Sequence, residues 1–291
     1  MSALVPSPRT LFLREIEKPE EELDLGRAAL LVAKEEHPQL PVERYTTRLD
    51  VLAEEVRGRL SGETAPPVVL RELVEVLYTR WGLKGNREHY YDHRNSFLNE
   101  VLDRGLGIPL TLGIVVMEVG RRLELTLEAV NFPGHFMVRQ PGESVDLLVD
   151  PFDGGRILFE DQAQELLDRI YGGMVRVQPG FLQAVGPREV LARLLRNLRG
   201  IYMNDEEVPR AVAVLERLLL LDPGAPMELR DLGTLLARMG RTAEAVEPLE
   251  RYLEVASDSG DARRIRSLLE RLRRMEGARA EDDAGRDDEG G

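Results

Sequence analysis

The chain has 291 residues, of which 43% are hydrophobic and 31% charged, and it contains no cysteine. This length and composition are typical of a globular protein with two folded units. The formal net charge of −13 argues against a nucleic-acid partner, and the lack of cysteine excludes disulfides, thiolate metal sites and a thiol nucleophile. The sequence has neither a leader-like apolar segment nor an apolar run long enough to span a membrane. We therefore expect a cytoplasmic protein with no membrane partner.

Helical patterns follow a poorly patterned start. Residues 1–20 are expected to form an N-terminal arm. Apolar residues then recur at helical spacing in three segments that end near Pro or Gly, which predicts three helices with one buried face each. These helices cover residues 24–37, residues 41–60 and a stretch that carries Leu70 to Trp81.

A nearly continuous apolar segment, Pro109 to Leu123, follows a short predicted helix over residues 96–103. Proline suits the first turn of a helix, where its missing N–H has no intrahelical partner. We therefore predict a helix buried on several sides, with a buried strand as the alternative because residues 114–116 are β-branched. Strand patterns come next, and they predict a small antiparallel sheet in an α+β layer. These patterns cover residues 127–132, 135–140, 145–150 and 156–158.

The turn between two of these strands suggests a pair of polar residues. If Gln140 pairs with Val145, the antiparallel register places His135 opposite Asp150, and directly opposed residues have Cβ atoms about 4.5–5.5 Å apart. Phe136 and Val138, two residues further along the strand, then share one face. His135 and Asp150 share the other face, which we expect to lie against the central helix.

Four motifs occur in order in this region: Asn95-Ser96-Phe97-Leu98, Gly107-Ile108-Pro109-Leu110-Thr111-Leu112, Phe132-Pro133-Gly134-His135-Phe136 and Asp150-Pro151-Phe152. Together they resemble the transglutaminase-like superfamily, and in particular the bacterial SirB-type family, which joins such a domain to tetratricopeptide repeats. The resemblance covers roughly residues 10–260. It implies a papain-like α+β fold, with N-terminal helices and a small antiparallel sheet around a buried central helix.

The resemblance also implies a site. In catalytic members of the superfamily a Cys begins the central helix, and a His and an Asp follow on adjacent strands. These two carry over to His135 and Asp150, whereas the Cys position falls between Gly107 and Thr111 and holds no Cys. Thr111 is the candidate replacement nucleophile, although a hydroxyl needs a general base during attack. Further candidate residues for binding are Asn95, Tyr91 and Phe152.

Two other readings apply to polar residues of this region. His89 and His93 stand four residues apart, which is the spacing of metal ligands on one helix face, but no third ligand is evident and we expect no metal or cofactor. Ser96 is read as a helix cap rather than a nucleophile. The His135–Asp150 pair itself can be a retained base with its orienting carboxylate, or a structural pair that locks the hairpin.

The C-terminal third is predicted to be helical. An offset of 34 residues aligns apolar and Ala positions of two segments, and this period resembles tetratricopeptide repeats. The aligned pairs are Leu195 with Leu229, Leu198 with Leu232, Ala211 with Ala245, and Leu215 with Leu249. The last residues are rich in acidic side chains and contain no apolar run, so we expect them to be disordered.

The sequence thus predicts an N-terminal arm, a transglutaminase-like domain, a tetratricopeptide-like segment and a disordered acidic tail. Their boundaries are residues 1–20, 21–186, 187–276 and 277–291. The leading hypothesis is a non-catalytic or degenerate transglutaminase-like protein, a pseudoenzyme that binds a protein or peptide in its repeat groove and acts in regulation. The alternative is a hydrolase or acyltransferase that uses His135 and Asp150 with water or Thr111. Enzymatic activity therefore stays open, with the absent Cys against it, and so do the partner, the substrate and the oligomeric state.

Overall fold

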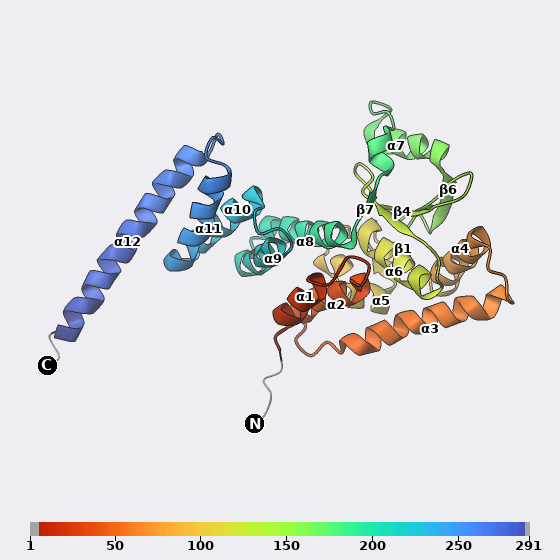
Figure 1. Ribbon diagram of the computed structural model, residues 1–291, viewed down its shortest axis with the longest axis horizontal. Coiled ribbons are helices and arrows are strands. Elements are labelled where there is room, and N and C mark those ends of the chain that lie inside the picture. Colours follow the sequence, from red (N-terminus) through yellow and green to blue (C-terminus); the bar gives the residue numbers. More distant parts are fainter. Residues whose placement is uncertain (1–5, 289–291) are drawn as a thin grey trace, which may run out of the picture. The chain divides into compact units, whose positions relative to one another are not determined.

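The computed structural model describes residues 6–288 (Figure 1). They fall into two compact units, which divide between Leu194 and Leu195, inside helix α8 (Pro187–Asn204). The first unit has the expected α+β composition, and the described part of the second consists of helices and turns. Within residues 6–288, no helix combines the length and the apolar character needed to cross a membrane.

Part of the expected N-terminal arm, residues 1–20, is a helix that was not predicted. Helix α1 (Pro8–Ile16) begins after Ser7, whose hydroxyl caps the helix. Phe12 is fully buried, and α1 packs on the next helix of the chain. A helix this short holds too few apolar residues for a helical period to stand out in the sequence. Residues 1–5 of the expected arm lie outside the described residues.

The predicted helices follow in order and form one layer of the first unit. The third continues from its α-helical part into a π-helical segment, η1, before the chain turns at Trp81. The bounds are α2 (Leu25–Glu36), α3 (Val42–Leu60), α4 (Pro66–Val74) and η1 (Glu75–Arg80). After them come a two-residue strand β1 (Lys84–Gly85), the 3₁₀ helix η2 (His93–Ser96), α5 (Leu98–Arg104) and β2 (Leu106–Gly107), which pairs with β1 in parallel.

The central helix is α6 (Pro109–Arg122), as the apolar segment predicts, and the alternative of a strand there is wrong. Most of its residues are buried, because helices and the sheet surround it. Gly113 is the point of closest approach to the sheet. A Cβ atom at Gly113 would lie 2.4 Å from the ring of Phe136, so only glycine allows the helix to pack this closely.

A five-stranded antiparallel sheet lies beside α6, in the order β6-β5-β4-β3-β7. Strand β7 was not among the predicted strands, because its two residues follow a long loop and carry no strand pattern. The bounds are β3 (Glu128–Val130), β4 (Met137–Gln140), β5 (Leu147–Asp150), β6 (Arg156–Phe159) and β7 (Ala184–Val185).

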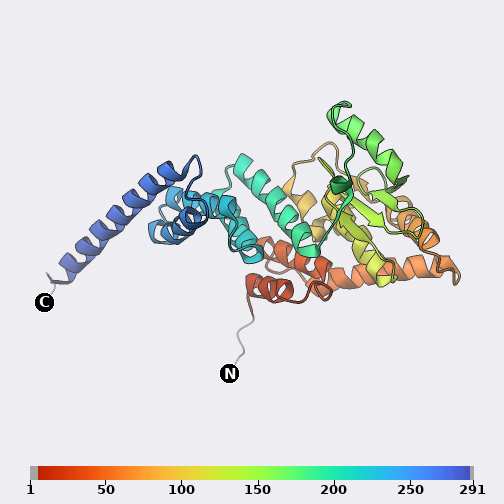
Figure 2. The same cartoon turned by 45° about the horizontal axis from the view of Figure 1, so that its top comes forward.

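The two faces of the sheet are covered by different helices. Phe136 and Val138 point toward Gly113 of α6. On the other face, Met137 and Leu148 pack in an apolar cluster with helix α7 (Ala163–Tyr171). Figure 2 shows the strands between these two helices. It is therefore the Phe136 face that meets the central helix, and the expectation that the opposite face does so is wrong.

The register of the β4–β5 hairpin also differs from the prediction. Gln140 pairs with Leu147 instead of Val145, a shift of two residues. The connection is longer than expected because the carboxylate of Asp146 accepts a hydrogen bond from the N–H of Gly142 and closes the loop, with Val145 inside it. A shift of two residues keeps each side chain on its predicted face, whereas a shift of one would reverse every face.

The second unit contains stacked helices with the predicted core. The eight repeat positions aligned in the sequence are at most 5% exposed: Leu195, Leu198, Ala211, Leu215, Leu229, Leu232, Ala245 and Leu249. Gly233 lies where two helices approach, since a Cβ atom there would be 2.5 Å from the side chain of Leu249. The helices are α9 (Val208–Leu221), α10 (Pro226–Arg238), α11 (Thr242–Val255) and α12 (Ala262–Asp288).

The backbone of α12 continues into the segment expected to be disordered from Gly277 onward. It is helical through Asp288, so the prediction of disorder is corrected up to that residue, and residues 289–291 lie outside the described part. Residues 278–288 include three Ala and two Arg, which have high helix propensity, together with four Asp and one Gly, which do not. The prediction of disorder rested on the acidic charge of this segment and on its lack of an apolar run.

Candidate functional site

His135 and Asp150 meet at the open end of the β4–β5 hairpin. His135 lies just before β4 and Asp150 is the last residue of β5. The distance between Nε2 of His135 and Oδ1 of Asp150 is 2.7 Å, and the two side chains are 10% and 3% exposed. The structure therefore brings these two predicted residues together in a buried hydrogen bond.

Asp150 is held in its ionised form by its surroundings. Burial by itself raises the pKa of this carboxyl. The hydrogen bond and charge of His135, with the backbone N–H groups of Phe152 and Asp153 that donate to Oδ1, outweigh burial and place the pKa of Asp150 below its ordinary value. A carboxylate in this state orients the imidazole and stabilises a positive charge on it.

The imidazole of His135 is oriented with its second nitrogen away from Asp150. Among the described residues, no hydrogen bond reaches Nδ1 of His135. The ring of Phe152 contacts the imidazole edge-on, with centroids 6.4 Å apart. One nitrogen of the imidazole is thus fixed by a carboxylate, and no hydroxyl group of the described residues hydrogen-bonds to the ring.

Arg193, in the part of α8 that belongs to the first unit, fixes the chain around His135. Its guanidinium donates to the carbonyl oxygen of His135 at 2.7 Å and to the side-chain oxygen of Asn131 at 2.8 Å. It also lies over the ring of Phe136 at 5.6 Å from the centroid. Burial lowers the pKa of Arg193. Arg193 was not predicted from the sequence, because it lies far along the chain from His135 and no motif surrounds it.

Tyr78, from η1, is a second residue near the pair that no sequence motif indicates. Its ring packs against Gly155, where a Cβ atom would overlap it at 2.4 Å. Its hydroxyl is buried, and no described residue hydrogen-bonds to it. Burial and the nearby negative charge of Asp150 raise its pKa well above the ordinary range, so the phenol stays neutral. The only signal in the sequence was the predicted helix that ends at Trp81.

Aromatic side chains border the pair. Phe152 packs edge-on against Tyr90, with centroids 5.7 Å apart, and the guanidinium of Arg87 lies over Phe152 at 4.9 Å. Tyr91 contacts Tyr90 and is 78% exposed. Phe152 is thus part of the site, whereas Tyr91 lies at the surface beyond Tyr90. Burial raises the pKa of Tyr90.

Asn95 is the centre of a polar network that holds the loop before α5. Its side-chain N–H₂ donates to the carbonyls of His89 and Tyr90, at 2.7 and 3.1 Å. Its side-chain oxygen accepts from Asn86 and Arg104, at 3.0 and 3.1 Å. All of these partners belong to the protein itself. The network positions the loop that carries Tyr90 and Tyr91, which border the His135 site.

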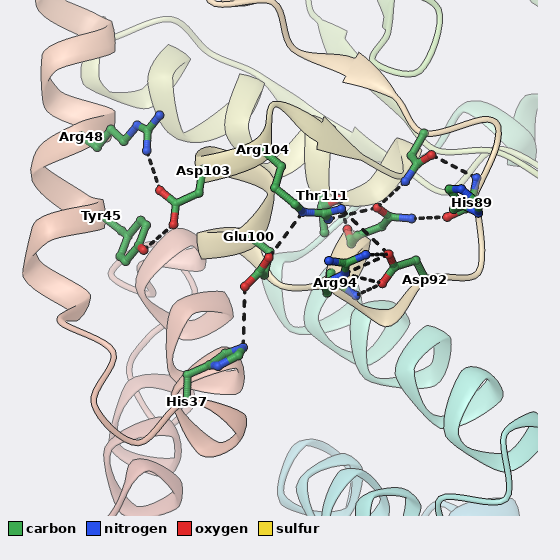
Figure 3. Close-up of polar contacts among 12 residues, drawn as sticks. His37, Tyr45, Arg48, His89, Asp92, Arg94, Glu100, Asp103, Arg104 and Thr111 are labelled. Atoms are coloured by element: carbon green, nitrogen blue, oxygen red, sulfur yellow. Dashed lines mark hydrogen bonds and ion pairs between the residues drawn. The ribbon is translucent and has the colours of Figure 1, made fainter.

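Thr111 is bound to this network and to its own helix start. Its hydroxyl donates to the carbonyl oxygen of Asn95 at 2.7 Å and accepts from the N–H of Ile108 at 3.2 Å, and the residue is fully buried (Figure 3). Among the described residues, no contact joins this hydroxyl to His135. The structure thus does not bring the third candidate residue together with the pair.

The two histidines at metal-ligand spacing do not share a helix face. His89 lies in a turn, and His93 begins the 3₁₀ helix η2 and packs edge-on against Phe97. Asp92, between them, binds Arg94 instead, which holds its pKa below the ordinary value (Figure 3). Within the described residues, no group of three possible ligands is close enough to hold a metal.

Comparison with known proteins places these features in a family. The family model of the transglutaminase-like superfamily matches residues 43–196, and that of a tetratricopeptide repeat matches residues 198–270. Two UPF0162 proteins from strains of Xylella fastidiosa are 35% and 36% identical to the chain over 253 residues, which is 86% of this chain and 90% of each relative. A UPF0162 protein of Pseudomonas aeruginosa is 30% identical over 85% of this chain and 90% of its own length. The chain therefore belongs to the UPF0162 proteins of the transglutaminase-like superfamily, with a tetratricopeptide repeat after the transglutaminase-like part.

Proposed function

We propose that the protein is an interaction or regulatory module in which the helical repeats bind a partner protein and the transglutaminase-like unit performs no acyl transfer. The observation that carries the proposal is the state of Thr111. It is the candidate replacement for the missing Cys, and its hydroxyl is fully buried and donates to the carbonyl of Asn95.

A working nucleophile would need a different environment. Superfamily chemistry depends on a thiolate, and thiolate character comes from a Cys at the positive end of a helix beside a histidine. The chain has no Cys, and moving the Thr111 hydroxyl toward a substrate would leave the carbonyl of Asn95 without its donor. Leaving a buried group unpaired costs about 1–3 kcal/mol. The His135–Asp150 pair then has a structural task, which is to close the hairpin end.

The repeat unit supports the interaction half of the proposal. Tetratricopeptide repeats generally present a groove that receives a peptide or helix. Here the stacked helices bury their own core, so their remaining faces are available for a partner.

The test uses the full chain and one matched variant. Wild type and His135→Ala are assayed against p-nitrophenyl esters and amides, and both are immobilised to capture proteins from a bacterial lysate. We expect no turnover that depends on His135, and the same captured proteins with both chains. Turnover that disappears in His135→Ala would overturn the proposal. Capture of no protein by either chain would refute its interaction half.

One observation favours a second candidate function, hydrolysis by an activated water. His135 is oriented by an ionised carboxylate through Nε2 and leaves Nδ1 without a hydrogen bond among the described residues. A histidine held in this way can act as a general base toward water. The same His135→Ala assay decides between the two candidates.

A further inference from the structure

The repeat unit contains an apolar groove between α10 and α12. Its volume is about 550 Å³, and Gly240 and Thr242 at the junction of α10 and α11 also line it. The apolar lining comes from Ala237 of α10 and from four residues of α12 spaced along one face of that helix. Those four residues are Ile265, Leu268, Leu272 and Met275. Met275 is 50% exposed, so an apolar surface is open to solvent here.

The charged side chains that line this groove are all basic. They are Arg238 from α10 and Arg264 and Arg271 from α12, and none of the described residues that line the groove is acidic. This sign is opposite to that of the whole chain, which has a formal net charge of −13. Among the described residues, Arg238 and Arg271 have no acidic partner, and Arg264 has only Asp261, at 4.0 Å. Most arginines of the repeat unit are paired within the protein, so these cations are available to a ligand.

The spacing of these residues fits a helix. Arg264 and Arg271 stand seven residues apart on α12, which is about 10 Å along the helix axis. Carboxylates seven residues apart on a second helix have the same separation, and apolar residues between them would face Leu268 and Leu272. Arg238 stands on the opposite wall and can bind a further carboxylate.

We propose that this groove binds an acidic amphipathic helix of a partner protein, with its apolar side chains on the α12 floor and its carboxylates on the three arginines. The inference rests on the proposed function, because it names the class of partner that the repeats would bind. Charge complementarity and the apolar floor together select this occupant. A purely acidic segment lacks apolar anchors, and a basic helix would meet like charge on both walls.

The experiment uses the full chain and a fluorescein-labelled helical peptide built from Leu and Glu, with Leu at positions i, i+3 and i+7 and Glu on both sides of that stripe. Binding is followed by fluorescence anisotropy at low ionic strength. A version with Lys in place of Glu, a version with Ala in place of Leu, and a single-stranded oligonucleotide of equal charge serve as comparison ligands. The test variant is Arg238→Glu/Arg271→Glu. Its matched control is Arg263→Glu/Arg274→Glu, which makes the same charge change at exposed positions outside the groove.

We expect the Glu peptide to bind wild type and the control with the same affinity. Its affinity for the test variant should be lower by about tenfold or more, because two exposed ion pairs become repulsive. The Lys and Ala peptides and the oligonucleotide should bind at least about tenfold more weakly than the Glu peptide.

Equal binding to the test variant and the control, or no binding of the Glu peptide to wild type, would overturn this inference. Tighter binding of the oligonucleotide would replace it with a nucleic-acid site. A circular-dichroism melt checks that the variants stay folded. If lysate proteins are captured but the peptide fails, the proposed function stands and only the helix chemistry is wrong.

Discussion

The buried pair at the hairpin end offers a quantitative test through two substitutions of Asp150. Oδ1 of Asp150 accepts three hydrogen bonds, from His135 and from the N–H groups of Phe152 and Asp153. Asp150→Leu removes the acceptor of all three donors in a site that is 2% exposed. Each unpaired buried donor costs about 1–3 kcal/mol, and partial exposure of His135 relieves part of the loss. We therefore expect Asp150→Leu to lower the free energy of unfolding by about 3–5 kcal/mol.

Asp150→Asn is the matched control, because it keeps the size of the side chain and an oxygen that can accept from both backbone N–H groups. It should cost about 1–2 kcal/mol, mainly from the lost charge beside His135. Urea denaturation followed by circular dichroism measures both values, provided that the slope of unfolding free energy against urea is unchanged. A loss below about 1 kcal/mol for Asp150→Leu, or equal losses for the two variants, would refute the reasoning.

Three further predictions follow from packing and charge. Because the pKa of Asp150 is lowered in the folded state, its ionised form stabilises the fold above the unfolded pKa of about 4. Urea denaturation between pH 6 and pH 3 should therefore show the advantage of wild type over Asp150→Asn shrinking as the pH falls, and a constant difference would contradict this. Ala245→Leu should lower the free energy of unfolding by about 1–3 kcal/mol, because Ala245 is fully buried between repeat helices; an unchanged melting temperature would count against the repeat assignment. Gly113→Ala gains about 1 kcal/mol of helix propensity, but its Cβ atom would lie 2.4 Å from the ring of Phe136. We expect a net loss of about 1–3 kcal/mol in urea denaturation, and a stabilised variant would disprove the close packing.

Several features were accessible from the sequence because they depend on neighbouring residues or on a fixed period. The central helix follows from a continuous apolar segment that begins with Pro109. The repeat core follows from the 34-residue offset, and Ala245 is fully buried as that offset requires. The face on which each side chain of the hairpin lies is predicted correctly even though the register is wrong by two residues, because side chains alternate with a period of two.

Other features depended on contacts that no local pattern records. Phe12 is buried because a later helix covers it, so the expected arm is a helix. Thr111 stood at the right place in its motif to be a nucleophile, yet its hydroxyl binds the carbonyl of Asn95, sixteen residues earlier in the chain. Spacing could not decide whether Thr111 is a nucleophile or a buried hydrogen-bond donor, since both roles need the same residue at a helix start.

The sequence by itself determined the α+β class, the repeat segment, the identity of the His135–Asp150 pair and the absence of a thiol. These follow from composition, periodicity and the order of motifs. Only the tertiary structure decided that Arg193 holds the backbone of His135, that Tyr78 lies beside Asp150, and that arginines of two helices gather around one apolar groove. The physical reason is that such sites are built from residues far apart in the chain. Their proximity depends on how whole helices pack, and no single segment encodes it.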